Sequence, residues 1–522
     1  MNTKPLDIPA TFWELIEIRA AATPDGAFLE DEQGAALTFA GYRDAAERVA
    51  AGLLSVGIDR GSIVAWQLPT TIDSAVLMAA LSRLGATQVP IIPILREREV
   101  TYITRESRSD WFLVRSDWRG FDYRALAETV AAQIGFAVLT VDSLPEADPA
   151  TLPQPPTAHE AKEPHWLYYT SGSTSDPKGA WHRDASVIAA SSAWIQGFEP
   201  TADDLFPMAA PFTHIAGVAM TSMSLRTGMR ILLMEAFDPQ RSPLVMAERG
   251  ATLLGGALPL FNAFLAAQRA NGPDPLWPRL RVGVNGGAPK PAWLHQEVKE
   301  VLGGAGVEGA WGLTEFPVAT CGNLDDSDEE LAGSEGVPGP GVEIRVLNLE
   351  GLEMGPGEEG ELCVRGPQMF LGYADASLNK DAFDDQGFLR TGDLGTVSES
   401  GHVTITGRVK DIIIRNAENI SAAEIEEYLH LHPAIADVAV IGLPDPRTGE
   451  RACAVVSLGD GYETLSLTDL AAHCREQGLA TQKIPEQLEI VKVVPRNSMG
   501  KIEKAALRAA FSSGVPTRSS SS

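Results

Sequence analysis

The stretch Tyr169-Thr-Ser-Gly-Ser-Thr-Ser-Asp-Pro-Lys-Gly179 decides how this sequence is interpreted, and it overlaps the end of the apolar segment His165–Tyr169. An apolar run that ends in glycine and small polar residues is typical of a buried strand followed by a loop. Glycine lets a backbone approach an anion closely, and successive N–H groups can form an anion-binding nest. The sequence therefore predicts a strand that leads into a phosphate-binding loop. Further donors come from hydroxyl side chains and one lysine, namely Thr170, Ser171, Ser173, Thr174 and Lys178.

Two better-known nucleotide-binding patterns do not fit the sequence. In a Walker A loop counted from Gly172, the second required glycine falls on Pro177, and a glycine follows the lysine where Ser or Thr is needed. The run 304–309 matches the dinucleotide pattern GxGxxG, but it follows a helical stretch, 293–302, instead of a strand. We interpret this run as a helix end and a turn. A P-loop enzyme and a nicotinamide enzyme are therefore disfavoured.

Length, composition and charge exclude several classes of protein. The chain has 522 residues, more than one hydrophobic core supports, so we expect at least two domains. Its apolar fraction of 44% and charged fraction of 21% are ordinary for a folded globular protein. A net charge of −27 opposes general binding to nucleic acids or anionic membranes, because like charges repel. We therefore expect small-molecule ligands and no nucleic-acid partner.

The cysteines and the apolar stretches favour a cytoplasmic protein. No CxxC pair occurs, so neither a disulfide framework nor a zinc-site spacing is indicated. The first residues, 1–13, lack an apolar core of signal-peptide length. One of the longest apolar stretches, 209–223, is too short to cross a bilayer. We therefore expect a cytoplasmic location and no membrane span. The four cysteines are Cys321, Cys363, Cys453 and Cys474.

Hydrophobic periodicity predicts an α/β fold for the first half of the chain. Helical spacing and short strand-like runs alternate there, and this alternation favours layers of helices on partly parallel sheets. The Pro-rich segment 144–164 predicts a surface connector. The expected helices are 11–22, 39–56 and 74–84, and the expected strands are 62–67 and 87–94.

The second half of the chain changes pattern twice. Short β-type runs with Gly and Pro turns predict a β-rich subdomain at 333–365. Beyond Gly407 the pattern predicts a compact α+β unit, in which Ser421 and Glu424 form the capping box of a helix, 422–431. Strands are expected after that helix, at 438–442 and 452–458.

Four further segments follow the phosphate loop in order along the chain. They are Gly309-Ala-Trp-Gly-Leu-Thr-Glu315, Arg390-Thr-Gly-Asp-Leu394, Gly407-Arg-Val-Lys-Asp411 and Pro495-Arg-Asn-Ser-Met-Gly-Lys501. Together the five segments resemble the adenylate-forming superfamily of acyl-CoA synthetases, peptide-synthetase adenylation domains and luciferases. The resemblance extends from the first predicted helix to Lys504. Within the superfamily, the chain is more similar to medium-chain and cyclic-acid CoA ligases than to the large fatty-acid enzymes.

The resemblance implies an ATP-dependent ligase. In the family the acid oxygen attacks the α-phosphorus of ATP and pyrophosphate leaves, so a dispersed anionic transition state needs cations and fixed dipoles. By resemblance, Lys501 contacts the acid carboxylate and the α-phosphate and is the main catalytic residue. Glu315 and Thr174 would hold Mg²⁺, and His214 matches the family histidine of the acid pocket. The implied catalytic residues are therefore Lys501, Glu315, Thr174 and His214.

The family's ATP site carries over to this sequence position by position. By resemblance, Asp393 would bind the ribose hydroxyls and Arg408 the ribose–phosphate region. Trp311 stands where the family usually has Tyr or Phe and would stack on adenine, whereas a structural indole in the core is the alternative. The implied ATP-binding residues are Thr170, Ser171, Gly172, Ser173, Thr174, Lys178, Gly287, Ala288, Trp311, Gly312, Thr314, Asp393, Arg408 and Lys501.

Two half-reactions at one carbonyl imply a small C-terminal domain that moves. By resemblance, Lys410 is the hinge between an N-terminal adenylate-forming domain, 1–409, and a C-terminal domain, 410–516. A disordered tail is predicted at 517–522. The CoA loop would contain Asn416, Ala417 and Glu418. Relatives commonly have Gly-Gly at the first two of these positions, but alanine adds only a methyl group, so we expect the pantetheine tunnel to survive.

The predicted acid pocket lacks acidic residues. No Asp or Glu occurs at 205–234, where a peptide synthetase normally carries an aspartate for the amino group of its substrate. An uncompensated buried ammonium would be costly, so an amino acid is disfavoured and a medium-chain aliphatic or alicyclic acid is expected. Arg226 and Arg230 leave a dicarboxylate open, although on an amphipathic helix they would face solvent. The predicted pocket residues are His214, Ala216, Gly217 and Gly286, with the strand and turn at 255–260.

The predicted reaction makes an acyl-AMP and pyrophosphate from an acid and ATP, and then a thioester with CoA, which releases AMP. ATP, Mg²⁺ and CoA are the expected cofactors, and fatty acid metabolism is the expected context. An acyl-AMP ligase that loads the phosphopantetheine of a carrier protein stays open, although only 78 residues (393 − 315) separate Glu315 from Asp393, which leaves little room for the insertion of such ligases. An inactive nucleotide-binding homologue is the third alternative, which the presence of Glu315 and Lys501 opposes. A homodimer stays open.

Overall fold

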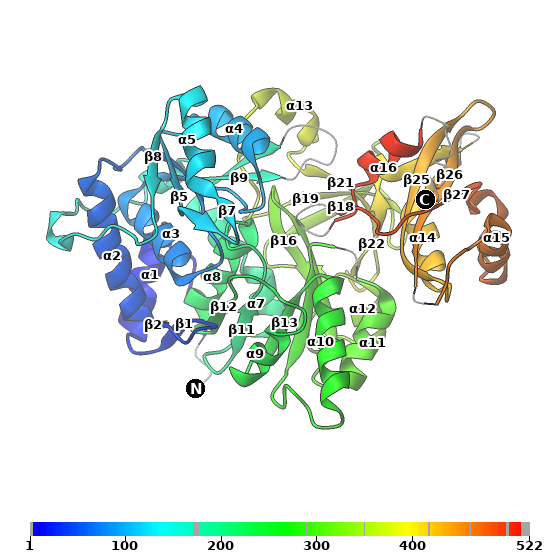
Figure 1. Ribbon diagram of the computed structural model, residues 1–522, viewed down its shortest axis with the longest axis horizontal. Coiled ribbons are helices and arrows are strands. Elements are labelled where there is room, and N and C mark those ends of the chain that lie inside the picture. The colour runs from blue at the N-terminus through cyan, green and yellow to red at the C-terminus, as the bar shows by residue number, and fades with distance from the viewer. Residues whose placement is uncertain are drawn as a thin grey trace.

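The computed structural model describes residues 4–170, 177–288, 290–348, 350–415, 418–459, 461–496 and 501–512, with only the backbone of residues 418 and 419. Within these ranges the strands form six sheets, one of them a two-stranded hairpin of β6 (Asp117–Trp118) and β7 (Phe121–Asp122). Figure 1 shows a broad layered body that contains the helices and sheets of the first 400 residues, with the last sheet at one end. No described helix is both long and apolar enough to traverse a membrane.

The first sheet has the strand order β20-β10-β9-β4-β3-β5-β8 and is parallel at its centre. Helices α2 and α3 pack on one face of it and helices α4 and α5 on the other, because its strands bury side chains on both faces. The strands are β3 (Ile63–Gln67), β4 (Thr87–Pro90), β5 (Trp111–Val114), β8 (Ala137–Thr140), β9 (Trp166–Thr170), β10 (Lys178–His182) and β20 (Gly372–Tyr373). The helices are α2 (Phe39–Ser55), α3 (Ile72–Leu84), α4 (Glu97–Glu106) and α5 (Tyr123–Ile134).

Two further sheets complete the α/β part of the chain. One has the order β11-β12-β1-β2 and the other β13-β14-β15-β16-β17. Their strands are β1 (Ala27–Asp31), β2 (Ala36–Thr38), β11 (Leu205–Met208), β12 (Arg230–Leu233), β13 (Leu253–Gly256), β14 (Val282–Gly286), β15 (Val307–Leu313), β16 (Phe316–Cys321) and β17 (Val337–Pro338). The helices around them are α1 (Phe12–Ala22), α6 (Asp184–Ala189), α7 (Ser192–Phe198), α8 (Ile215–Thr227), α9 (Ser242–Glu248), α10 (Leu258–Asn271), α11 (Ala292–Val301) and α12 (Asp328–Gly333).

The remaining two sheets lie in the second half of the chain. An antiparallel sheet of order β18-β19-β21-β22 contains β18 (Glu343–Leu347), β19 (Gly360–Arg365), β21 (Leu389–Val397) and β22 (Val403–Arg408), and α13 (Asn379–Ala382) lies beside it. The last sheet contains β23 (Ile412–Arg415), β24 (Glu418–Ser421), β25 (Ile435–Asp445), β26 (Gly449–Leu458) and β27 (Gln487–Ile490). It packs with α14 (Ala422–His430), α15 (Leu467–Glu476) and α16 (Lys504–Phe511), which Figure 1 shows around it.

Most of the predicted elements are confirmed, and the differences have physical causes. The strand predicted at 87–94 ends at Pro90, because proline lacks the N–H that a ladder needs. The acid-pocket segment at 255–260 is not a strand and turn alone, since α10 begins at Leu258. The run 304–309 is indeed a turn after α11, and β15 begins within it at Val307. The predicted tail, 517–522, lies outside the described residues.

Candidate active site

The phosphate loop connects two antiparallel strands of the first sheet. Thr170 at the end of β9 pairs with Lys178 at the start of β10, so the loop is closed at its base. Ser171, Gly172, Ser173 and Thr174 lie outside the described residues. The ammonium of Lys178 lies 5.3 Å from the ring centroid of Tyr373, which belongs to the neighbouring strand β20. The predicted strand and loop boundary is therefore confirmed, and Lys178 points towards Tyr373.

Glu315 occupies a tight turn between two strands. β15 and β16 form a hairpin in which Leu313 pairs with Phe316, so that Thr314 and Glu315 are its two turn residues. The Tyr373 hydroxyl donates a hydrogen bond of 2.6 Å to Oε1 of Glu315, whose exposed fraction is 7%. The partly buried carboxylate is therefore held in one orientation at the edge of the sheet.

The same turn is fixed from behind by a buried histidine. Nε2 of His182 lies 2.8 Å from the carbonyl oxygen of Thr314, to which it donates. Burial lowers the pKa of His182 to about 4, so the ring is neutral near pH 7 and carries its proton on Nε2. Because His182 ends β10, it ties the turn to the strand that follows the phosphate loop.

Asp393 lies between two donors from different sheets. It pairs across β21 and β22 with Arg408, whose Nε donates to Oδ1 of Asp393 at 2.5 Å. The indole Nε1 of Trp311, on β15, donates to Oδ2 at 2.9 Å. Asp393 is 6% exposed and Trp311 8% exposed. The expectation that Trp311 acts through its ring face is thus incomplete, because its N–H also orients the carboxylate of Asp393.

Lys501 lies within electrostatic reach of these charges. Burial lowers the pKa of Lys501, and the charge of Arg408 lowers it further, whereas Asp393 and Glu315 act in the opposite direction. Lys501 in turn contributes to the environment of His214, whose pKa is lowered to about 4 by burial first and by Lys501 second. Lys501 is therefore close enough to four other predicted site residues to act on their charges or to be acted on by them, namely Glu315, Asp393, Arg408 and His214.

His214 directly precedes α8, the helix that carries Ala216 and Gly217 of the predicted acid pocket. Its Nδ1 accepts a hydrogen bond of 3.2 Å from the backbone N–H of Ala216, which makes it the N-cap of α8. It also lines a small cavity between the first sheet and α8. Gly217 is required in this turn, because a Cβ there would lie 2.0 Å from the carbonyl oxygen of Phe212. The residues around the cavity are Pro90, Ile91, Ile92, Leu95, Ile103, Tyr168, Tyr169, Thr213, His214, Ile215 and Thr314.

The other predicted glycines differ in what they require. A Cβ on Gly312 would lie 2.4 Å from the backbone nitrogen of Val318, so the hairpin leaves no room for a side chain. Val318 itself has φ of 51°, which is strained for a β-branched residue. Gly286 ends β14 with space for a methyl group, and Gly287 is exposed with φ of 80°. The carbonyl of Ala288 accepts a hydrogen bond from the buried Asn285 amide.

The arginine near the predicted acid pocket does not face solvent as expected. α8 is buried almost all round, not amphipathic, and Arg226 lies in its last turn. Its guanidinium donates to the carbonyl of Leu6 and to the hydroxyls of Ser191 and Ser192. Those contacts occupy Arg226 at the opposite end of the helix from His214, so it is not placed to bind a second carboxylate.

A buried carboxyl group lies on β15, beside Cys321 of β16. Glu308 on β15 is 0% exposed, and burial raises its pKa to about 8. Its Oε2 accepts a long contact of 3.8 Å from the thiol of Cys321, and its Oε1 has no hydrogen-bond partner among the described residues. Glu308 is therefore mostly protonated near pH 7.

The predicted hinge, Lys410, is followed by β23, which precedes the predicted CoA loop in the sequence. Lys410 belongs to a short helical turn, Val409–Asp411, between β22 and β23. Arg415 and Glu418 are paired across β23 and β24, and Asn416 and Ala417 between them lie outside the described residues.

Sequence reasoning missed Tyr373 and His182, because their roles depend on partners 58 and 132 residues away. No local pattern carries that information.

Comparisons with known proteins agree with this geometry. Residues 16–374 match the family model described as AMP-binding enzyme, and residues 424–501 match the AMP-binding enzyme C-terminal domain. The chain is 31% identical to the medium-chain fatty-acid–CoA ligase of Escherichia coli (strain K12), over 96% of this chain and 89% of the relative. It is also 31% identical to the 2,3-dihydroxybenzoate-AMP ligase of Bacillus subtilis (strain 168), over 96% and 94%.

A solved structure with the same architecture is that of ATP-bound MatB from Rhodopseudomonas palustris. The TM-score is 0.85 and the identity 27%, over 96% of this chain and 99% of MatB. The chain thus belongs to the AMP-binding enzyme family within the adenylate-forming superfamily, and it is an AMP-forming acid–thiol ligase. ATP is a substrate of this family.

Proposed function

We propose that this protein is an ATP-dependent acid–CoA ligase that adenylates a medium-chain aliphatic or alicyclic acid. The observation that carries the proposal is the convergence around one centre of Glu315, Asp393, Arg408 and Lys501, which come from two sheets and from the C-terminal segment. Such a set of fixed charges can stabilise the dispersed negative charge of a phosphoryl transition state. No nucleophilic side chain is required, because the acid itself attacks the α-phosphorus.

Lys501 would hold the reacting groups together. Its ammonium can bridge the acid carboxylate and the α-phosphate, and so it reduces their repulsion as they approach. Burial lowers the pKa of Lys501, but the proposed role requires the protonated amine, because only the charged form neutralises the anions. His214, which is neutral, would border the carboxylate without adding a second charge.

The residues present fit Mg²⁺ beside the phosphates. Mg²⁺ prefers hard oxygen ligands, and Glu315 offers a mostly buried carboxylate whose direction is set by the Tyr373 hydroxyl. Glu315, with Thr174, would hold the ion, which when bound would neutralise charge on the phosphates. The work of Tyr373 in this proposal is to keep Oε1 occupied and so to direct the other oxygen outwards.

Asp393 would bind the ribose. A carboxylate can accept several hydrogen bonds, so Trp311 and Arg408 can orient it while the ribose hydroxyls donate to the remaining lone pairs. In this proposal Trp311 contacts the nucleotide with its ring and fixes Asp393 with its N–H. Arg408 adds positive charge beside the phosphates.

The second half-reaction would require the C-terminal domain to turn at Lys410. With Lys501 beside Asp393, Glu315 and His214, the described arrangement suits adenylation. We place the domain boundary between residues 409 and 410, in the helical turn that follows β22. Rotation there would exchange Lys501 for the loop that contains Asn416, Ala417 and Glu418, which would admit the thiol of CoA.

The substrate class is inferred from an uncharged acid side. Helix α8 and strand β13 carry no acidic residue, and Arg226 is engaged elsewhere. A pocket with these walls favours an apolar acyl chain or ring over an amino acid or a dicarboxylate. A second candidate is an acyl-AMP ligase that loads a carrier protein, which the likeness to 2,3-dihydroxybenzoate-AMP ligase favours.

The deciding experiment measures pyrophosphate release with straight-chain, cyclic, aromatic and dicarboxylic acids, each with and without CoA. The expected result is release with medium-chain and cyclic acids, and AMP formation that depends on CoA. Transfer to a carrier-protein phosphopantetheine without any activity on free CoA would select the second candidate. A Glu315→Gln variant serves as the matched negative control, because it keeps the volume of the side chain and removes its charge.

A further inference from the structure

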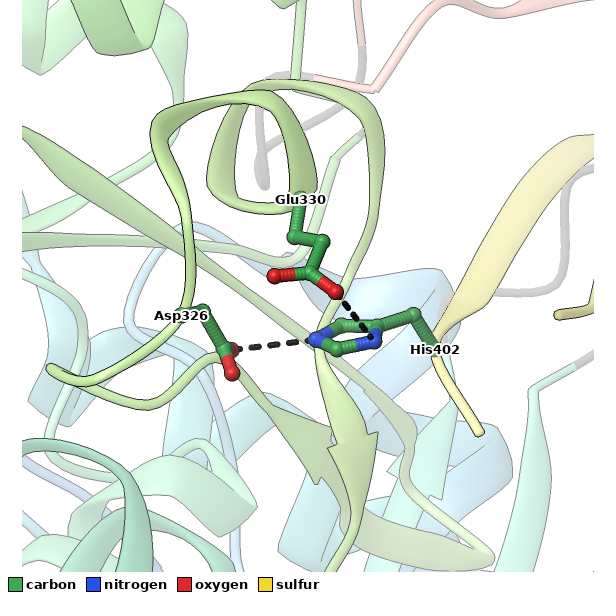
Figure 2. A group of neighbouring side chains, drawn as sticks. All are labelled: Asp326, Glu330 and His402. Atoms are coloured by element: carbon green, nitrogen blue, oxygen red, sulfur yellow. Dashed lines mark ion pairs between the residues drawn. The ribbon is translucent and has the colours of Figure 1, made fainter. Parts of the chain in front are cut away.

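A second group of polar side chains lies away from the nucleotide site, at the opposite end of β22 from Arg408. It consists of Asp326, Glu330 and His402, whose ligand atoms all lie within 4.8 Å of one another (Figure 2). Asp326 precedes α12, Glu330 belongs to α12, and His402 directly precedes β22. The proposed adenylation chemistry uses none of the three.

The backbone around the three residues is held in place by the pairing of two segments. The N–H of Glu335 donates to the carbonyl of Val403, and the N–H of Val403 donates to the carbonyl of Gly336. The hydroxyl of Thr404 donates to the carbonyl of Gly333 at 2.9 Å. The segment that carries the two carboxylates therefore cannot move independently of the histidine.

Both carboxylates are oriented by local hydrogen bonds. Oδ2 of Asp326 accepts from the backbone N–H of Asn323 at 2.8 Å. Oε2 of Glu330 accepts from the backbone N–H and the hydroxyl of Ser327, at 2.9 and 2.8 Å. These bonds lower the pKa of Glu330, which keeps it ionised, and they leave its Oε1 directed at His402, as Figure 2 shows.

The histidine has an inward-facing nitrogen that lacks a hydrogen bond. His402 is 8% exposed, and its Nε2 makes no hydrogen bond with any described residue, although it lies 3.2 Å from Oδ2 of Asp326. Its Nδ1 lies 2.9 Å from the hydroxyl of Ser400 and 3.6 Å from Oε1 of Glu330. A proton on Nδ1 is therefore partnered, and the lone pair of Nε2 then faces a carboxylate. Either a proton on Nε2 or a cation between these two electron-rich atoms removes their repulsion.

We propose that Asp326, Glu330 and His402 form a binding site for a divalent transition-metal cation, of which Zn²⁺ is the best representative. A cation about 2.1 Å from each ligand atom places neighbouring ligand atoms roughly 3.0–3.4 Å apart. The Nε2–Oδ2 separation of 3.2 Å fits this range, whereas Oε1 of Glu330 lies 3.6 Å from the other ring nitrogen, Nδ1, and would have to turn towards the cation on binding. An imidazole nitrogen with carboxylate oxygens suits Zn²⁺ better than Mg²⁺ or Ca²⁺, which prefer oxygen alone. Water would complete the coordination, because Glu330 is only half-buried.

The cation would join α12 to the start of β22. β22 leads directly to Arg408, so a metal at one end of the strand stiffens the element that presents this arginine to Asp393 at the other. Binding to the folded chain alone stabilises it by mass action, and the melting temperature should therefore rise with the concentration of Zn²⁺.

The test is a calorimetric titration of the full-length, chelator-treated protein with Zn²⁺ alone, in buffer without nucleotide or Mg²⁺. One high-affinity site per chain is expected. His402→Gln and Asp326→Asn should each weaken that site by about tenfold or more. Because the substitutions are close in shape, circular dichroism and the metal-free melting temperature verify that the variants are folded.

Two matched controls separate this site from adventitious binding. Glu329→Gln removes an exposed carboxylate from the same segment, and His432→Gln removes a partly exposed imidazole that lies 4.8 Å from that of His473. Neither control should change the high-affinity site. A Co²⁺ titration should give visible absorption that disappears in His402→Gln. The absence of Zn²⁺ binding, or binding that persists unchanged in His402→Gln, would overturn the proposal and leave His402 as an imidazolium that bridges two carboxylates.

Discussion

The nucleotide side and the acyl side of the candidate active site are built on different physical principles. On the nucleotide side, Asp393 is held by Trp311 and Arg408, and Glu315 is held by Tyr373, so each carboxylate has named donors. On the acyl side, α8 and β13 offer small and apolar residues and contain no Asp or Glu. The nucleotide side holds charged groups in fixed positions, whereas the acyl side offers an apolar surface whose shape selects the ligand.

This difference explains why one enzyme family can activate many acids with one chemistry. Charges that stabilise a transition state must keep their positions to within a fraction of an ångström, because electrostatic preorganisation is lost when they move. Apolar walls tolerate changes of volume at a cost of about 1–3 kcal/mol per methylene group. Substitutions on the nucleotide side should therefore reduce rates, whereas those on the acyl side should change the range of substrates.

The largest effect is expected from Lys501→Ala. Removal of the ammonium leaves the carboxylate and the α-phosphate without their bridging cation, and adenylation should fall by about 10²- to 10³-fold. Acid-dependent exchange between ATP and pyrophosphate measures this step. Thioester formation from supplied acyl-AMP should be nearly unchanged, because Lys501 is needed only before the domain rotates.

The exposed Lys492 provides a matched control, and Lys492→Ala should leave both half-reactions at the wild-type rate. An equal loss of both half-reactions in Lys501→Ala would contradict the assignment of this lysine to adenylation alone. In that event Lys501 would be needed in both half-reactions, before and after the proposed rotation.

Tyr373→Phe should have the second-largest effect. The variant loses only the hydroxyl that donates to Oε1 of Glu315, so the carboxylate can rotate away from the phosphates. A hydrogen bond to a charged group contributes about 1.5–3 kcal/mol, which corresponds to roughly tenfold or more in rate. The rate of pyrophosphate release should fall most at low Mg²⁺ and recover in part at high Mg²⁺.

The KM for the acid serves as the control for the Tyr373→Phe variant. The apparent KM for the acid should stay within about twofold, because the substitution lies on the nucleotide side and the two sides are separate. A loss of acid affinity as large as the loss in rate would show that the two sides are coupled through the hairpin at Thr314 and Glu315. The nucleotide side and the acyl side would then not act independently.

Much of this site could be predicted from the sequence, and what could not be predicted depends on distant contacts. Glu315, Asp393, Arg408 and Lys501 lie in short runs that resemble the motifs of the family, and this resemblance assigns them to one site. The N–H of Trp311 and the hydroxyl of Tyr373 act on partners 82 and 58 residues away. The strands that bring such pairs together are joined by non-local pairing, which local periodicity does not encode.

Trp311→Phe should have a smaller effect than Tyr373→Phe. Phenylalanine keeps a ring beside the nucleotide but cannot donate to Oδ2 of Asp393, which Arg408 still orients through Oδ1. We expect the KM for ATP to rise by about threefold to tenfold, with little change in kcat. The same comparison with 3′-deoxy-ATP should show a smaller rise, because Asp393 then has one fewer ribose hydroxyl to bind. An equal rise with both nucleotides would indicate that Trp311 acts only through stacking.

The smallest effect on activity is expected from Glu308→Gln, because this buried side chain contacts Cys321 and none of the residues proposed to bind the nucleotide. The pKa of Glu308 is raised by burial from 4.5 to about 8, so the folded protein keeps a proton that the unfolded chain releases above pH 4.5. The stability associated with the neutral side chain is therefore present below pH 4.5 and is lost as the pH rises towards 8. Glutamine does not titrate, so the variant should gain stability relative to the wild type over this range, with a slope of at most about 1.4 kcal/mol per pH unit.

Denaturant unfolding of both proteins at pH 5, 6.5 and 8 measures this difference, and all other titrating groups cancel because both chains share them. The KM for ATP should be the same in both, since Glu308 lies on β15 well before the turn that carries Glu315. A difference in stability that does not change with pH would mean that Glu308 is ionised in the folded protein.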